Sequence, residues 1–112
     1  MKIALRFSPS PAEDVVKYTL YGMKAIDGVA LDKITAEFAV DFGKPEVDLE
    51  GFCQVVLNDV PGLSSLDGIY NCGISATDEA GNESQMLTEG FTGVNVDFVS
   101  PGPPTSGSVL FF

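Results

Sequence analysis

The residues of this sequence that could do chemistry are two cysteines, a pair of adjacent serines and 16 carboxylates. Ser64 and Ser65 are candidate nucleophiles, but the sequence contains no histidine, so no imidazole base can activate a hydroxyl group. Neither Cys53 nor Cys72 has a basic neighbour along the chain that would lower the pKa of its thiol. We therefore predict that the protein is not an enzyme and has no catalytic residue.

One acidic loop, residues 78–84 (DEAGNES), carries the oxygen ligands that a calcium ion prefers, on Asp78, Glu79, Asn82 and Glu83. The acidic positions lack the dense alternation of a dedicated calcium loop. The glycine-asparagine pair in this loop is typical of a tight turn. We favour a turn over a calcium site, and we expect neither a metal nor a cofactor.

The charge of the chain limits its partners. Six basic and 16 acidic residues give a formal net charge of −10. Nucleic acids and anionic membrane surfaces both require a basic footprint, so neither is expected as a partner. No apolar run approaches the ~20 residues that would span a bilayer. The acidic surface either keeps the protein soluble or complements a basic patch on a protein scaffold.

Short runs of alternating apolar and polar residues predict an all-β chain. The 12 glycines and 7 prolines punctuate these runs at close intervals, and helical periodicity is missing. Residues 25–32 are weakly patterned and predict a loop. Strands are predicted over residues 3–7, 15–21, 34–42, 52–57, 69–77 and 94–99. Several short strands separated by turns are typical of an antiparallel sandwich or barrel.

Three segments carry a resemblance to a known family. Residues 69–84 (IYNCGISATDEAGNES) closely resemble the F strand and F–G loop of bacterial fibronectin type III domains. Residues 5–21 (LRFSPSPAEDVVKYTLY) are similar to the B strand, B–C loop and C strand of that family, with Phe7 where the family usually has a core tryptophan. Residues 58–63 (NDVPGL) resemble its E–F turn. The resemblance implies an immunoglobulin-like, fibronectin type III-like antiparallel β-sandwich.

The two ends of the chain depart from the family pattern. A fibronectin type III domain begins with an A strand, whereas this chain starts on the strand that resembles B. After residue 99 comes SPGPPTSGSVLFF, which resembles the linker and A strand that would open the next domain of a tandem array. We therefore predict two parts. Residues 1–100 form the sandwich, and residues 101–112 form a Pro/Gly-rich C-terminal arm that ends in an apolar strand.

The direction of the strands limits where this arm can dock. Strands A and G of such a sandwich run the same way, so the arm would have to travel back to fill its own A position. The residues from Pro101 to Ser106 reach at most ~20 Å, which is short for that return. Docking on a neighbouring subunit needs no return, and docking on the arm's own sandwich is the alternative. The predicted interface residues are Val109, Leu110, Phe111 and Phe112 as donor, with Ile3 and Leu5 near the acceptor edge.

Together these observations predict a non-enzymatic structural or assembly protein. We expect a homo-oligomer, a place in a larger assembly such as a capsid or tail scaffold, or both. The N-terminus lacks a secretory signal pattern, which favours a virion-associated subunit (a phage decoration or accessory protein made in the host cytoplasm) and free thiols at Cys53 and Cys72. The alternatives are an extracellular filament or surface subunit, and a spacer or binding module of a larger secreted polysaccharide-degrading enzyme.

Overall fold

The structure, a computed structural model, describes residues 2–63, 66–97 and 106–111. Its regular elements are almost entirely strands, as predicted, with one short 3₁₀ turn (η1, Leu57–Asp59) after the fourth strand. The strands are β1 (Ala4–Phe7), β2 (Val15–Lys24), β3 (Phe38–Gly43), β4 (Cys53–Val56), β5 (Asp67–Asp78) and β6 (Val94–Asp97). Residues 98 and 99, predicted to end the last strand, lie outside the described residues.

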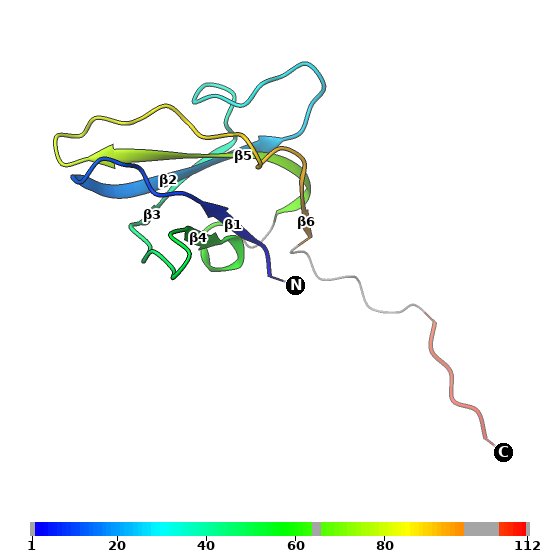
Figure 1. The fold of residues 1–112 in the computed structure, drawn as a ribbon. Coiled ribbons are helices and arrows are strands. Elements are labelled where there is room, and N and C mark those ends of the chain that lie inside the picture. The colour runs from blue at the N-terminus through cyan, green and yellow to red at the C-terminus, as the bar shows by residue number, and fades with distance from the viewer. Residues whose placement is uncertain (1, 64–65, 98–105, 112) are drawn as a thin grey trace.

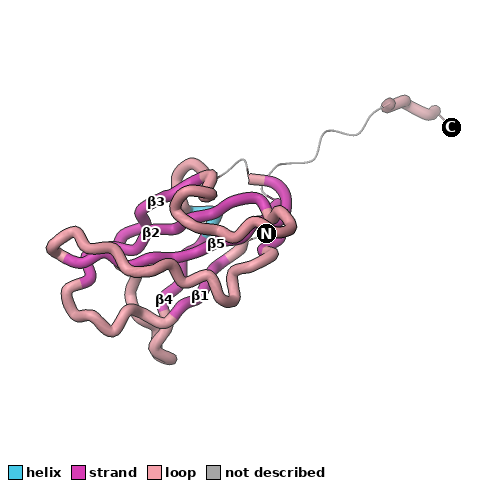
Figure 2. Tube along the Cα trace, turned by 90° about the horizontal axis from the view of Figure 1, so that it is seen from above, coloured by secondary structure: helices cyan, strands magenta, loops and turns pink. Residues whose placement is uncertain are grey.

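The strands form two antiparallel sheets arranged as a β-sandwich (Figures 1 and 2). One sheet contains only β1 and β4, and the other has the order β3-β2-β5-β6. The longest ladder joins β2 to β5 through nine register pairs, from Val15 opposite Asp78 to Lys24 opposite Tyr70. The all-β fold with antiparallel sheets is thus confirmed.

The core between the two sheets is built from the inward-facing residues that the alternation predicted. Leu20 has no exposed surface, and Ile74 opposite it on β5 is also buried. Phe7, Tyr18 and Phe42 form an aromatic cluster in which the ring centroids of Phe7 and Tyr18 lie 5.0 Å apart, edge to face. Such edge-to-face pairs stabilise a core beyond the area that they bury.

Strand β2 continues past Gly22, where the sequence predicted that it would end. Gly22 lies opposite Phe38 on β3, and a methyl group at Gly22 would overlap the ring of Phe38. Because Gly22 has no side chain, the Phe38 ring packs directly against it. The centroid of this ring lies 6.3 Å from that of the Tyr70 ring. Gly22 marks a close packing position rather than a turn.

The strand predicted from residue 34 begins only at Phe38, so its first four residues were wrongly predicted. The Asp32 carboxylate accepts hydrogen bonds from the backbone N–H groups of Ile34 (2.8 Å) and Thr35 (2.7 Å). Such local bonds offer the backbone an alternative to a sheet ladder. They close a turn here, and the Ile34 side chain is exposed although its place in the alternation predicted burial.

The four-stranded sheet is also covered on its outer face. Residues 83–87 run beside β5, with bridges from Glu83 to Thr77 and from Leu87 to Ile74. Met86 from this segment and Leu31 from the loop after β2 pack on Gly73, where a side chain would collide with Met86. Both faces of the sheet therefore carry buried residues, which a pattern of period two cannot predict.

Both cysteines are free and buried, which agrees with the interpretation as thiols. Cys53 lies opposite Phe7 in the β1–β4 pair, and Cys72 lies opposite Gly22 in the other sheet. Burial raises the pKa of the Cys72 thiol to about 11. Burial also raises the pKa of Cys53. The two thiols therefore stay protonated at neutral pH and act as small apolar core residues.

The contact between Gly22 and Phe38 leads to a test of the packing. We expect Gly22→Ala to lower the free energy of unfolding by about 1–3 kcal/mol, since the new methyl group must displace an aromatic ring. Urea denaturation measures this loss. Gly107→Ala is the control, because nothing lies within 4 Å of that position. A Gly22→Ala protein as stable as the parent chain would contradict the assigned packing, whereas partial recovery on adding Phe38→Leu would support it.

Candidate functional site

The first candidate feature of the fold is the free edge of β1. Among the described strands, β1 pairs only with β4. The carbonyl of Ile3 accepts a hydrogen bond from the Leu57 N–H (2.8 Å), and the Ile3 N–H donates to the Asn58 side chain (2.9 Å). Because backbone groups alternate in direction along an antiparallel strand, Leu5 and Phe7 also face β4. The N–H and C=O groups of Ala4 and Arg6 therefore face outward along the free edge.

This assignment refines the predicted acceptor residues. Leu5 lies on the edge strand and Ile3 directly precedes it, but Leu5 is buried in the core, and the backbone groups of both residues are directed toward β4. The groups that a partner strand would meet belong to Ala4 and Arg6, which the sequence analysis did not single out. The alternation of residues 3–7 predicts that every second residue directs its backbone groups toward a partner strand. Which set of residues does so is known only from the pairing with β4.

A groove lies at the Phe7 end of this edge, between the two sheets. Its volume is about 210 Å³, and it is lined by side chains without formal charge. The apolar part of the lining comes from Phe7, Tyr18, Ile74, Ala76 and Leu87. In a chain with a net charge of −10, a lining without carboxylates is suited to an apolar segment rather than to a cation.

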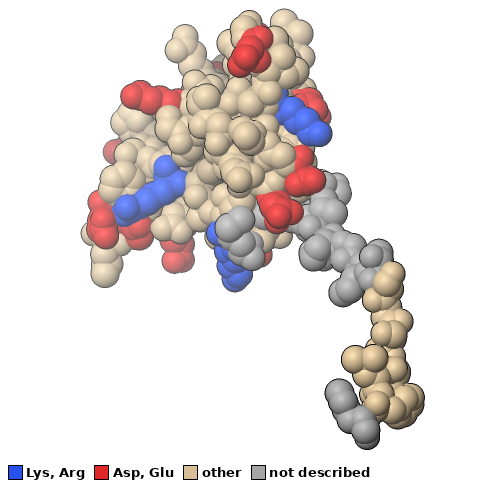
Figure 3. All heavy atoms as spheres, turned by 90° about the vertical axis from the view of Figure 1, so that its right-hand side faces the viewer, with Lys and Arg blue, Asp and Glu red and all other residues tan. Residues whose placement is uncertain are grey.

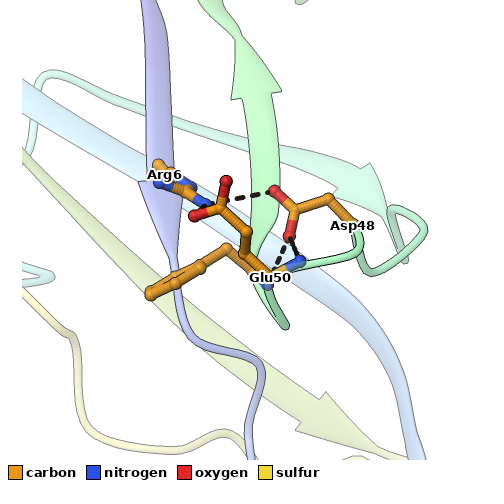
Figure 4. Close-up of polar contacts among 4 residues, drawn as sticks. Arg6, Asp48 and Glu50 are labelled. Atoms are coloured by element: carbon orange, nitrogen blue, oxygen red, sulfur yellow. Dashed lines mark hydrogen bonds and ion pairs between the residues drawn. The ribbon is translucent and has the colours of Figure 1, made fainter.

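The Arg6 side chain is held away from the free edge. Its guanidinium donates to the carboxylates of Glu50 (3.0 Å) and Asp48 (3.4 Å) and lies 4.0 Å from the ring centroid of Phe52, next to β4 (Figure 4). The hydrogen bond to Glu50 is the main cause that raises the pKa of Arg6. These exposed ion pairs contribute little stability, but they fix the direction of the side chain. Arg6 therefore offers its backbone to the edge without covering it.

The C-terminal arm is the second candidate feature. Its described residues, 106–111, extend away from the sandwich (Figures 1 and 3). Val109, Leu110 and Phe111 are 76%, 74% and 91% exposed. Phe112, the fourth predicted donor residue, lies outside the described residues. The structure thus does not bring the described donor residues to β1 of the same chain, and it leaves three large apolar side chains without cover.

The carboxylates of the acidic loop, residues 78–84, bind different groups and do not converge on one point. Asp78 closes the turn by accepting hydrogen bonds from the backbone N–H groups of Ala80 (3.0 Å) and Asn82 (2.9 Å). Glu83 turns to the outer face of the sheet and accepts hydrogen bonds from the hydroxyls of Tyr21 and Ser75, both at 2.5 Å. Within the part of the chain that the structure describes, no cluster of three or more His, Cys, Asp or Glu residues could hold a metal ion.

Glu83 also binds the Lys33 ammonium group (2.8 Å), so it joins the loop after β2 to the sheet. Burial alone would raise the pKa of Glu83, but the hydrogen bonds from Lys33, Ser75 and Tyr21 outweigh it and lower this pKa to about 2. The ionised carboxylate is therefore the form that the folded protein binds. Glu83 is a structural clamp that sequence reasoning had assigned only to a possible calcium loop.

Comparison with protein-family models, with curated proteins and with solved structures gives no match for this chain. None of the described helical segments has the length and apolar character needed to cross a bilayer.

The lowered pKa of Glu83 predicts a defined dependence of stability on pH. Because its pKa falls from 4.5 in the unfolded chain to about 2 on folding, its contribution is complete above about pH 4.5 and is lost as the pH falls toward 2. We expect Glu83→Gln to lower the free energy of unfolding by about 1–3 kcal/mol at pH 7. The difference from the parent chain should shrink between pH 4.5 and 2.

Urea unfolding at several pH values checks this expectation. Glu79→Gln is the matched control, because Glu79 is exposed in the same loop and should change stability by less than about 0.5 kcal/mol. Equal effects of the two substitutions, or a difference for Glu83 that does not change with pH, would show that the clamp does not depend on the charge of this carboxylate.

Proposed function

We propose that this chain is a non-enzymatic structural subunit that assembles through its C-terminal arm. The observation that carries the proposal is the exposure of Val109, Leu110 and Phe111 on a segment that extends away from the sandwich. Water-exposed apolar side chains in a row are costly unless a partner covers them. The chain also offers an unpaired strand edge, which other chains can extend by strand addition.

The arrangement of strands supports a fibronectin type III-like domain as the scaffold of this subunit. If β1 corresponds to strand B and β4 to strand E, then the order β3-β2-β5-β6 corresponds to C′-C-F-G. Strand β5, which carries the buried Tyr70, then stands in the F position, and the turn closed by Asp78 follows it as the F–G loop. The free edge of β1 is the side on which strand A of such a domain would pair.

The surface fits a component of a larger protein assembly. On the face shown in Figure 3, acidic side chains are spread over the sandwich with a few basic ones among them, whereas the described part of the arm carries no charge. We place the protein on a virion, as a decoration or accessory subunit, where an acidic body would dock on a basic scaffold and the arm would join subunits. An extracellular filament is the alternative setting for the same mode of assembly.

Removal of the arm tests the proposal. We expect the full chain to form oligomers at micromolar concentration and a chain that ends at Ser100 to be a folded monomer, since the apolar donor residues are gone. Light scattering gives the solution mass, and circular dichroism gives the fold of the shortened chain.

A full-length variant with Val109, Leu110 and Phe111 each replaced by Ser separates apolar contact from mere length. Its matched control replaces Ser106 and Ser108 by Ala, which should leave the mass unchanged. If the full chain and the shortened chain were both monomers over the same concentration range, self-assembly would be refuted, and a spacer module within a longer protein would become the better interpretation.

A further inference from the structure

We infer that the arm of one copy adds to the free edge of β1 in a second copy as an antiparallel strand. This inference rests on the proposed function and names the partner and the place of contact. Its basis is the juxtaposition of outward backbone groups on Ala4 and Arg6 with an uncharged groove at the Phe7 end of the same strand.

Two edges of the small sheet are free of other described strands, and the groove beside β1 is the one whose lining carries no charged residue. The outer side of β4 forms a groove of about 400 Å³ with segments of the same chain, among them Pro45 and Pro61. Chain segments alongside a strand are a usual means of protecting an edge. The Cys53 thiol of β4 also contacts the Pro45 carbonyl at 3.8 Å. On β1, the Arg6 side chain leans toward Asp48 and Glu50 beside β4 and not over the free edge (Figure 4).

The arm and the groove at β1 match in chemistry. Residues 106–111 contain no charged side chain, and none of the groove-lining residues is charged. An added strand places alternate side chains toward the core and toward solvent. Two of the consecutive apolar residues that start at Val109 would then continue the layer formed by Phe7 and Leu5. Other uncharged runs of this length, such as residues 18–23, 51–58 and 68–77, form strands and turns of the sandwich and are not available to a second copy.

The direction of the strands makes the contact head to tail. Asp97, which ends β6, lies opposite Asp67 at the start of β5, and Ala4 lies opposite Val56 at the end of β4. β6, which the arm follows in sequence, therefore ends at the pole where β1 begins (Figure 1). A strand antiparallel to β1 must enter at the other pole, beside Phe7. Donor and entry sites lie at opposite poles, so the interface is heterologous and forms rings or filaments rather than a closed dimer.

Disulfide trapping between two copies tests the contact. One copy carries Ala4→Cys, whose side chain is exposed on the outer face of β1, and the other copy carries a single added cysteine at position 108, 109, 110 or 111. The buried native thiols remain, and the parent chain gives their background. The two copies carry tags of different mass, so that mass spectrometry separates bonds between copies from bonds within one copy.

We expect bonds between copies at alternate arm positions, either 108 and 110 or 109 and 111, at least fivefold above the other pair. Alternation arises because only every second side chain of a strand faces the same side. Gln54→Cys is the matched control, since Gln54 lies opposite Arg6 on β4 and is exposed on the same sheet. Trapping at Gln54 in place of Ala4 would assign the arm to β4 and overturn the inference.

A second variant tests the backbone groups directly. Ala4→Pro removes an outward N–H but no bond to β4, and proline is tolerated on an edge of this kind. We expect association about two- to tenfold weaker, as for the loss of one hydrogen bond, with unchanged unfolding of the chain that ends at Ser100. Unchanged association would count against strand addition.

The outcomes separate this inference from the proposed function. If the chain assembles only with its arm but gives no alternating bonds to Ala4→Cys, the edge assignment fails and the structural role stands. If bonds form only within one copy, the partner assignment fails. If the full chain is a monomer, the proposed function itself fails.

Discussion

The pairing of β2 with β5 is the constraint on which the rest of the structure depends. Its nine register pairs hold two separate sets of contacts, one on each face of the sheet. Leu20 and Ile74 on the inner face meet the core residues of the small sheet, and Tyr21 and Ser75 on the outer face bind Glu83. A slip of one residue would exchange these faces and place a hydroxyl in the apolar core. Both sets of contacts therefore select the same register.

The distribution of charge follows from this two-sided burial. The carboxylates occupy turns and outer positions, where they accept hydrogen bonds from backbone N–H groups or bind the few basic side chains. The inter-sheet groove beside β1 is left without charge. Copies with a net charge of −10 repel each other at long range, and this repulsion is screened by salt. Any association between copies must then come from apolar contacts and backbone hydrogen bonds, which act only at short range.

Alternation of side chains was enough to predict the centres of the strands and most of the core. It failed where a single local contact decides the outcome. The Asp32 carboxylate closes a turn at Ile34. The Phe38 ring packs against Gly22, so β2 continues past this glycine. The turn residues were visible in the sequence, but their competition with strand formation depends on packing that the sequence does not display.

The candidate site was predicted in the same partial way. The apolar residues from Val109 onward stand out in any hydropathy pattern, and the strand predicted over residues 3–7 is present over Ala4–Phe7. The outward direction of the Ala4 and Arg6 backbone groups could not be predicted, because it depends on which residues pair with β4. The role of Glu83 was missed for a similar reason, since Tyr21, Ser75 and Lys33 come from three distant parts of the chain.

The position of β6 has a mechanical consequence. β6 runs toward the pole where β1 begins and precedes the arm in sequence, so tension on the arm pulls this strand along its own axis. All four of its register pairs with β5 then bear the load at the same time, in shear, instead of opening one after another. Four pairs against the nine of β2 and β5 make this the weakest ladder along the line of force in that sheet. A subunit stretched through its arm would release β6 first, while β2 and β5 stay paired.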